Sequence, residues 1–155
     1  MSKSEKTWQI NSDNQAEYKS LFDFIINLAK NQTESLIVFL NGNLGAGKTT
    51  FTKLFINYLN QSQKPLIINS PTFGKVHEYK IQNKNFYHLD LYREIPSAEE
   101  LEEIFLDLNS NYICLEWASK LTEKPEYNYL ISALAKRIIN LNFTVLSAEK
   151  RLIIL

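Results

Sequence analysis

The chain has 155 residues, 45% of them hydrophobic, which is enough for one buried core and predicts a single domain over residues 1–155. Its 17 basic side chains are balanced by 17 acidic ones, which excludes binding to nucleic acid through overall charge alone. The single cysteine, Cys114, excludes an internal disulfide. No apolar stretch reaches the ~20 residues of a membrane span and the amino terminus has no signal-peptide core, so we expect a cytoplasmic protein without membrane contact.

The first elements predicted along the chain are a short edge strand, a helix and a buried strand. Residues 7–10 have the pattern of the edge strand, and residues 12–14 offer the polar side chains of a helix start. The helix that follows should bury the apolar residues that recur at helical spacing: Tyr18, Leu21, Phe22, Ile25 and Leu28. Residues 36–40 form a continuous apolar run, typical of a buried parallel strand.

Residues 42–49 carry the most informative motif, G-x-x-x-x-G-K-T, the phosphate-binding P-loop. Its glycines allow backbone N–H groups to surround an anion, Lys48 supplies a positive charge, and the Thr49 hydroxyl is suited to Mg²⁺. An amphipathic helix follows, whose amino-terminal dipole also favours phosphate. The predicted nucleotide-binding residues are Asn43, Leu44, Gly45, Ala46, Gly47, Lys48, Thr49 and Thr50. ATP is the default ligand, because the chain lacks the Asn-Lys-x-Asp element for guanine.

The rest of the chain predicts further strands and one well-marked helix. Residues 75–90 show two alternating strands around residues 82–85, a β-hairpin inserted in an α/β chain. A capping box of Ser97 and Glu100 opens a helix with Leu101, Ile104, Phe105 and Leu108 facing inward. A buried strand (112–117), a loop (118–128) and a closing antiparallel pair (138–145 and 152–155) follow. The fold class predicted is a three-layer α/β domain, P-loop NTPase-like, with a mostly parallel sheet and antiparallel C-terminal strands.

Hydrolysis of a nucleotide needs a carboxylate near the metal and a group that positions water. Glu116 follows four apolar residues, the Walker B pattern, and should point to the metal; the alternative is a solvent-facing glutamate. Asp90 also ends an apolar strand and is a candidate general base, or else a turn cap. Thr72, in the Ser-Pro-Thr-Phe segment, is a candidate γ-phosphate sensor, or part of an ordinary turn. Trp117 is interpreted as either a core residue or a lid beside the nucleotide.

The histidines and arginines give weaker signals. His77 and His88 have no zinc-ligand spacing, so both are predicted to be structural or surface residues. The only arginines are Arg93, Arg137 and Arg151, and Arg93 is the favoured arginine finger because it follows Asp90 by three residues. A partner that supplies the positive charge is the alternative.

Several of these segments occur together in one order: the P-loop, Ser-Pro-Thr-Phe (70–73), His-x-Asp-Leu-Tyr-Arg (88–93), Glu-Glu-Leu (99–101) and Glu-Trp (116–117). Over about residues 7–145 this combination resembles the TsaE family, also called YjeE, of small bacterial P-loop ATPases. The resemblance implies an Mg²⁺-dependent ATPase that is slow alone and stimulated by partners. It would assist formation of N6-threonylcarbamoyladenosine at position 37 of tRNA by binding and resetting the TsaD–TsaB transferase complex, which would hold most of the tRNA.

The resemblance also implies a role for each matching residue. Lys48 would bind phosphate, Thr49 and Glu116 would hold Mg²⁺, Thr72 would sense the γ-phosphate, Asp90 would serve the attacking water, and Trp117 would lie beside the nucleotide. Two positions depart from the family pattern: Gly74 follows the Ser-Pro-Thr-Phe segment, and a late Gly-Arg pair is replaced by Lys136-Arg137. Arg137 is nevertheless expected to contact adenine.

Two other functions stay open at the level of sequence. A small nucleotide or nucleoside kinase would also use an acid followed by an arginine, as in Asp90 and Arg93, but the chain lacks an arginine-rich lid. A non-hydrolysing ATP-sensing module would use nucleotide binding to order residues 70–80 for a partner.

Overall fold

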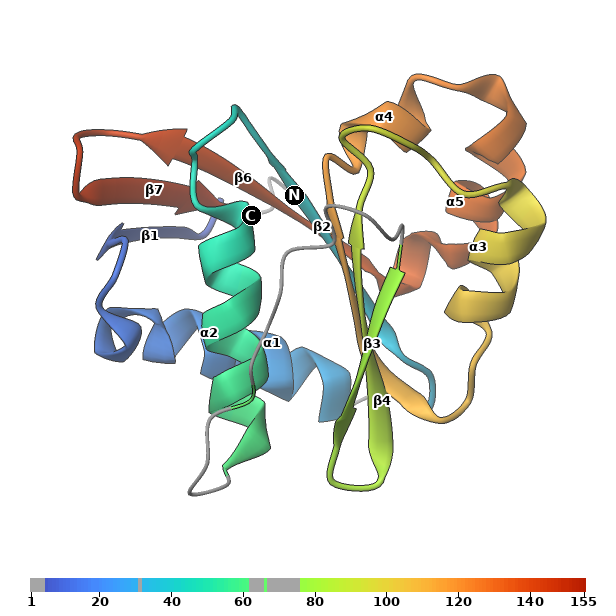
Figure 1. Ribbon diagram of the computed structural model, residues 1–155, viewed down its shortest axis with the longest axis horizontal. Coiled ribbons are helices and arrows are strands. Elements are labelled where there is room, and N and C mark those ends of the chain that lie inside the picture. Colours follow the sequence, from blue (N-terminus) through green and yellow to red (C-terminus); the bar gives the residue numbers. More distant parts are fainter. Residues whose placement is uncertain (1–4, 31, 62–65, 67–75) are drawn as a thin grey trace.

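The computed structural model describes residues 5–30, 32–61, 66 and 76–155, which form a seven-stranded sheet with helices on both faces (Figure 1). The strands are β1 (Thr7–Asn11), β2 (Leu36–Gly42), β3 (Val76–Ile81), β4 (Lys84–Asp90), β5 (Ser110–Glu116), β6 (Ile138–Val145) and β7 (Lys150–Ile154). The α-helices are α1 (Lys19–Lys30), α2 (Lys48–Asn60), α3 (Ala98–Phe105), α4 (Ser119–Thr122) and α5 (Asn128–Leu134). Short 3₁₀ helices are η1 (Gln15–Tyr18), η2 (Pro125–Tyr127) and η3 (Ala135–Arg137).

The strand order is β1-β7-β6-β2-β5-β4-β3, with parallel pairing in the middle and antiparallel pairing at both edges. The predicted hairpin is present as β3 and β4, and its second strand pairs in parallel with β5. The predicted C-terminal antiparallel pair is present as β6 and β7. The carboxyl ends of β2, β4 and β5 therefore meet at one end of the sheet, where ligands bind in open α/β folds.

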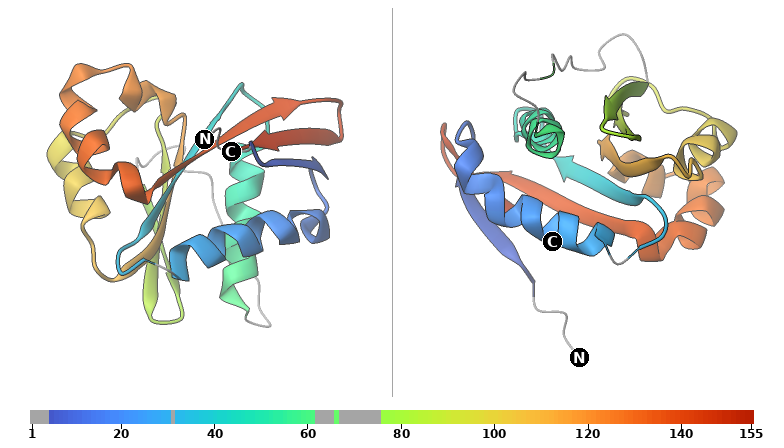
Figure 2. Two further views of the ribbon diagram at one scale, coloured as in Figure 1. Left: turned by 180° about the vertical axis from the view of Figure 1, so that it is seen from behind. Right: turned by 90° about the horizontal axis from the view of Figure 1, so that it is seen from below.

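Alternation along the central strands explains the three layers. In β2, Leu36, Val38 and Leu40 join the core under α1 and α2, whereas Ile37 and Phe39 join the core under α3, α4 and α5. Both sets are buried because successive strand residues face opposite sides of the sheet. Figure 2 shows the same division from behind, with α1 and α2 on one side of the sheet and the other helices opposite.

The structure corrects two predictions on the second face. Residues 118–128 are not a loop: they form α4 and η2 and lead into α5. Leu121 and Tyr127 in this segment are buried, so tertiary packing stabilises short helices that the polar sequence does not predict. Leu108 is 76% exposed because α3 ends at Phe105, three residues before it. None of the described helices is long and apolar enough to cross a membrane.

Candidate functional site

The G-x-x-x-x-G-K-T motif runs from Gly42, the last residue of β2, through a loop into Lys48 and Thr49 at the start of α2; we call residues 42–49 the glycine loop. Gly42 has a φ of 145°, and a Cβ there would lie 2.6 Å from the carbonyl oxygen of Phe143, so glycine is required by close packing. Gly47 has a φ of 105° and provides no side-chain cap for α2. The first N–H groups of α2 are therefore available to an anion, with the helix dipole behind them.

Lys48, the first residue of α2, folds back over the glycine loop. Its Nζ donates hydrogen bonds to the carbonyl oxygens of Gly42 at 2.6 Å and Asn43 at 2.9 Å. The side chain is buried, and this burial lowers the pKa of Lys48, opposed by the negative charges of Glu116 and Asp90. Both hydrogen-bond acceptors of Lys48 among the described residues are neutral carbonyl oxygens, which an anionic ligand would outcompete for its charge.

Thr49 and Glu116 meet across the sheet end. The Thr49 hydroxyl donates to Oε2 of Glu116 at 2.7 Å, although the residues are 67 positions apart. Glu116 ends β5, which pairs in parallel with β2, and its backbone lies level with Leu40 just before the glycine loop. A hydroxyl and a carboxylate oxygen are ligands that Mg²⁺ uses, and Mg²⁺ usually keeps several waters and substrate phosphates as its others. The donor set therefore fits the predicted metal.

Asp90 lies level with Glu116 on the neighbouring strand β4. Its Oδ1 accepts a hydrogen bond from the Tyr92 backbone N–H at 2.9 Å, which fixes the carboxylate at the strand end. Burial raises the pKa of Asp90, and the charge of Glu116 raises it further, against the Tyr92 hydrogen bond and the charge of Lys48. A half-buried carboxylate with a raised pKa beside Glu116 suits a general base.

Trp117 follows Glu116 in a backbone conformation that is rare for a large side chain, with a φ of 59°. Its N–H donates to the carbonyl oxygen of Leu40 at 3.0 Å, which ties the end of β5 to β2. The ring lies 4.0 Å from Nζ of Lys48 and 4.9 Å, centroid to centroid, from the ring of Tyr92. Trp117 is thus a half-buried residue of the site beside Lys48.

The sequence and the fold of this chain are similar to those of known proteins. Residues 13–145 match the family described as "Threonylcarbamoyl adenosine biosynthesis protein TsaE". This chain belongs to the TsaE family. Proteins named tRNA threonylcarbamoyladenosine biosynthesis protein TsaE are similar to it: the one from Rickettsia typhi is 37% identical over 126 residues, 80% of this chain and 79% of the relative. The one from Haemophilus influenzae is 42% identical over 97 residues, 60% and 59% of the two chains.

A solved structure shows the same fold as this TsaE family member. The crystal structure of Bacillus subtilis YdiB aligns with a TM-score of 0.61 and covers 97% of this chain and 84% of that one. The sequences are 23% identical, so this likeness bears on the fold, which is P-loop NTPase-like as predicted.

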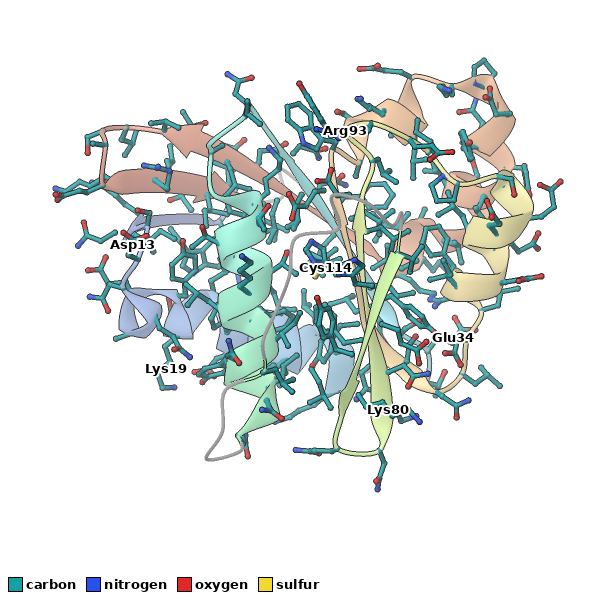
Figure 3. All side chains as sticks on the ribbon, viewed as in Figure 1. Asp13, Lys19, Glu34, Lys80, Arg93 and Cys114 are labelled. Carbon is teal, nitrogen blue, oxygen red and sulfur yellow. The ribbon has the colours of Figure 1, made fainter. Side chains whose placement is uncertain are left out.

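Arg137 is not at the glycine loop, contrary to the expectation of an adenine contact. Its guanidinium donates to the carbonyl oxygen and hydroxyl of Ser35 and to the carbonyl oxygen of Phe105, and it pairs with Glu34 at 3.4 Å. Ser35 precedes β2, whereas the glycine loop follows it, so the two lie about 20 Å apart at ~3.3 Å per strand residue. Figure 3 shows Glu34 at the end of the sheet away from Arg93.

The arginine that does reach the glycine loop is Arg151, from β7. Its Nη2 lies 3.4 Å from the carbonyl oxygen of Gly45, and its stem lies against Gly47. The Nε of Arg151 is buried without a hydrogen-bond partner among the described residues. Arg93, the favoured finger, is exposed after β4. The sequence contained no signal for Arg151, because its approach depends on how β7 folds back beside β6.

His88, predicted to be a structural or surface residue, is buried beside Glu116. Its Nε2 lies 2.7 Å from Oε1 of Glu116, and its side chain is fully buried. The signal was its position two residues before Asp90 on the same strand, which places both on one face of the sheet. Thr72, the predicted γ-phosphate sensor, lies outside the described residues.

Proposed function

We propose that the chain is an Mg²⁺-dependent ATPase of tRNA threonylcarbamoyladenosine biosynthesis, acting on a TsaD–TsaB transferase complex. The observation that supports it best is the meeting of Thr49 and Glu116, at 2.7 Å, beside an uncapped start of α2. This pairs a phosphate cradle with a carboxylate that can hold the metal. The pathway comes from the names of the family and its relatives.

Each site residue has its own role in the proposed reaction. Lys48 and the N–H groups at the start of α2 would bind the phosphates, and Thr49 and Glu116 would hold Mg²⁺, which when bound withdraws charge from the phosphates. Asp90 would accept a proton from water, a role that its raised pKa favours. Trp117 would lie beside the nucleotide, and Thr72 keeps its proposed role at the γ-phosphate. Residues Asn43, Leu44, Gly45, Ala46 and Thr50 would complete the binding loop.

In this proposal the arginine that contacts the nucleotide is Arg151, not Arg137. A guanidinium whose Nε is buried beside Gly47, with no hydrogen-bond partner in the described part of the chain, suits an arginine that faces the bound nucleotide. Arg151→Met should therefore weaken ATP binding, whereas Arg137→Met should not. Calorimetric titration of both variants with ATP measures the difference.

The function is tested by phosphate release from Mg²⁺-ATP, by the chain alone and with purified TsaD–TsaB. Slow release alone, faster release with the complex and loss of both in Lys48→Ala are the expected results. Tight ATP binding with no release in either case would instead support the ATP-sensing module. Transfer of phosphate to a nucleoside would support the kinase. The Lys48→Ala fold is checked by thermal unfolding, because its side chain also contacts Trp117.

A further inference from the structure

The carboxylate of Glu116 is held at both oxygens in this structure. Thr49 donates to Oε2, and the imidazole of His88 lies at hydrogen-bond distance from Oε1, each at 2.7 Å. Glu116 is 2% exposed and His88 is not exposed at all, so water does not compete for the contact. The two anchors come from different elements: Thr49 from the start of α2, and His88 from the interior of β4.

The hydrogen-bond network assigns the proton of the imidazole. A carboxylate only accepts hydrogen bonds, so Nε2 of His88 must be the donor to Glu116. Nδ1 is buried and has no hydrogen-bond partner among the described residues, so a proton there would be an unpaired buried donor. The neutral tautomer with the proton on Nε2 satisfies both conditions. Among the described residues, the ring nitrogens of His88 therefore have one hydrogen-bond partner, the carboxylate of Glu116.

The two anchors behave differently once the proposed metal binds. Thr49 would turn its hydroxyl oxygen toward the metal, and its donation to Glu116 would be given up or shared. His88 has no such second role, because its ring points to Oε1 from a fully buried strand position in register with Cys114 of β5. With the Thr49 bond lost, His88 is the described side chain that still fixes the rotation of the carboxylate. Groups that orient a metal ligand in this way affect metal affinity strongly.

We propose that His88 is a positioning residue for the metal site: it holds Oε1 of Glu116 so that Oε2 faces the bound Mg²⁺. This inference rests on the proposed function. Its alternative is a purely structural histidine, packed in the sheet and indifferent to the metal. The two differ in what they require of the side chain, since the structural role needs only volume, whereas positioning needs a donor at the place of Nε2.

Two amide variants separate these roles. The amide nitrogen of Gln lies as many bonds from Cβ as Nε2 does, so His88→Gln keeps the donor to Glu116. His88→Asn has the same chemistry but its amide is one bond shorter, at the place of Nδ1, and does not reach. The affinity of a non-hydrolysable ATP analogue is measured by calorimetry in excess Mg²⁺ and in EDTA, and the ratio of the two affinities reports the metal.

We expect His88→Asn to lower this ratio by about tenfold or more, the size seen for groups that support metal ligands, and His88→Gln to stay within about threefold of the unsubstituted chain. Affinity in EDTA should be equal in all three. Equal ratios in both variants would overturn the positioning role and leave the proposed function standing. A ratio of one in the unsubstituted chain would overturn the proposed Mg²⁺ site, and this inference with it.

A measurement on the unsubstituted chain covers the case in which a variant does not fold. The chain has two histidines, so the ¹⁵N shifts of the imidazole rings are assigned with a single His77→Asn variant. The positioning role requires a protonated Nε2 and a bare Nδ1 on His88, in the presence and absence of Mg²⁺ and the analogue. A proton on Nδ1 with a bare Nε2 would remove the donor and overturn the proposal.

Discussion

Replacing Arg137 by methionine tests whether this arginine stabilises the fold or contacts the nucleotide. The guanidinium donates three hydrogen bonds: Nε to the Ser35 carbonyl oxygen at 3.0 Å, and Nη2 to the Ser35 hydroxyl and the Phe105 carbonyl oxygen, both at 2.6 Å. They join the start of β2 to the end of α3. Methionine keeps the unbranched stem that fills the space and removes every donor.

The expected loss of stability follows from the acceptors left behind. A buried polar group that loses its partner costs about 1–3 kcal/mol, and both carbonyl oxygens would lose a charged donor. Part of this is recovered, because burying the guanidinium is itself unfavourable, as the lowered pKa of Arg137 shows. The ion pair with the half-exposed Glu34 adds little. We expect a net loss of about 3 kcal/mol, or roughly 6–12 °C in Tm for a domain of this size.

The assay is thermal and urea unfolding of Arg137→Met, with ATP affinity measured by calorimetry below the transition. Arg93→Met is the matched control, because it replaces the same side chain by the same residue at an exposed position. It should change Tm by no more than about 1–2 °C, since exposed substitutions stay within ±0.5 kcal/mol. A Tm of Arg137→Met near that of the control, together with a tenfold weaker ATP affinity, would refute the placement of Arg137 and return it to the nucleotide.

Three further changes test other parts of the structure. Burial raises the pKa of Asp90 above its usual value of 3.8. The protonated carboxyl group therefore contributes stability that is complete below pH 3.8 and is lost as the pH rises through the folded-state pKa. Asp90→Asn should raise Tm at neutral pH but not in acid, and it should abolish phosphate release. Gly42→Ala should destabilise the fold by about 1–3 kcal/mol in urea unfolding because its Cβ would meet the Phe143 carbonyl, whereas Gly45→Ala, with nothing within 4 Å of its Cβ, should lose less. Ser97→Ala removes the capping box of α3 and should cost about 1 kcal/mol in the same assay, with ATP affinity unchanged.

The sequence alone determined the elements whose signals are local. The apolar run of β2, the glycines that follow it and the capping box at Ser97 each specify their structure within a few residues, and all three are present. The buried runs that end in Asp90 and Glu116 also carried enough information to place both residues at one sheet end, because parallel strands bring their carboxyl ends together.

Only the tertiary structure decided which distant side chains meet there. The position of Arg151 against Gly47 depends on the return of β7 beside β6, and that of Arg137 against Ser35 depends on the direction of β6 beside β2. The bond from His88 to Glu116 depends on the register between two strands joined by a long crossover. Such contacts arise from strand order and register, which involve residues far apart in the chain and leave no periodic or compositional pattern around either partner.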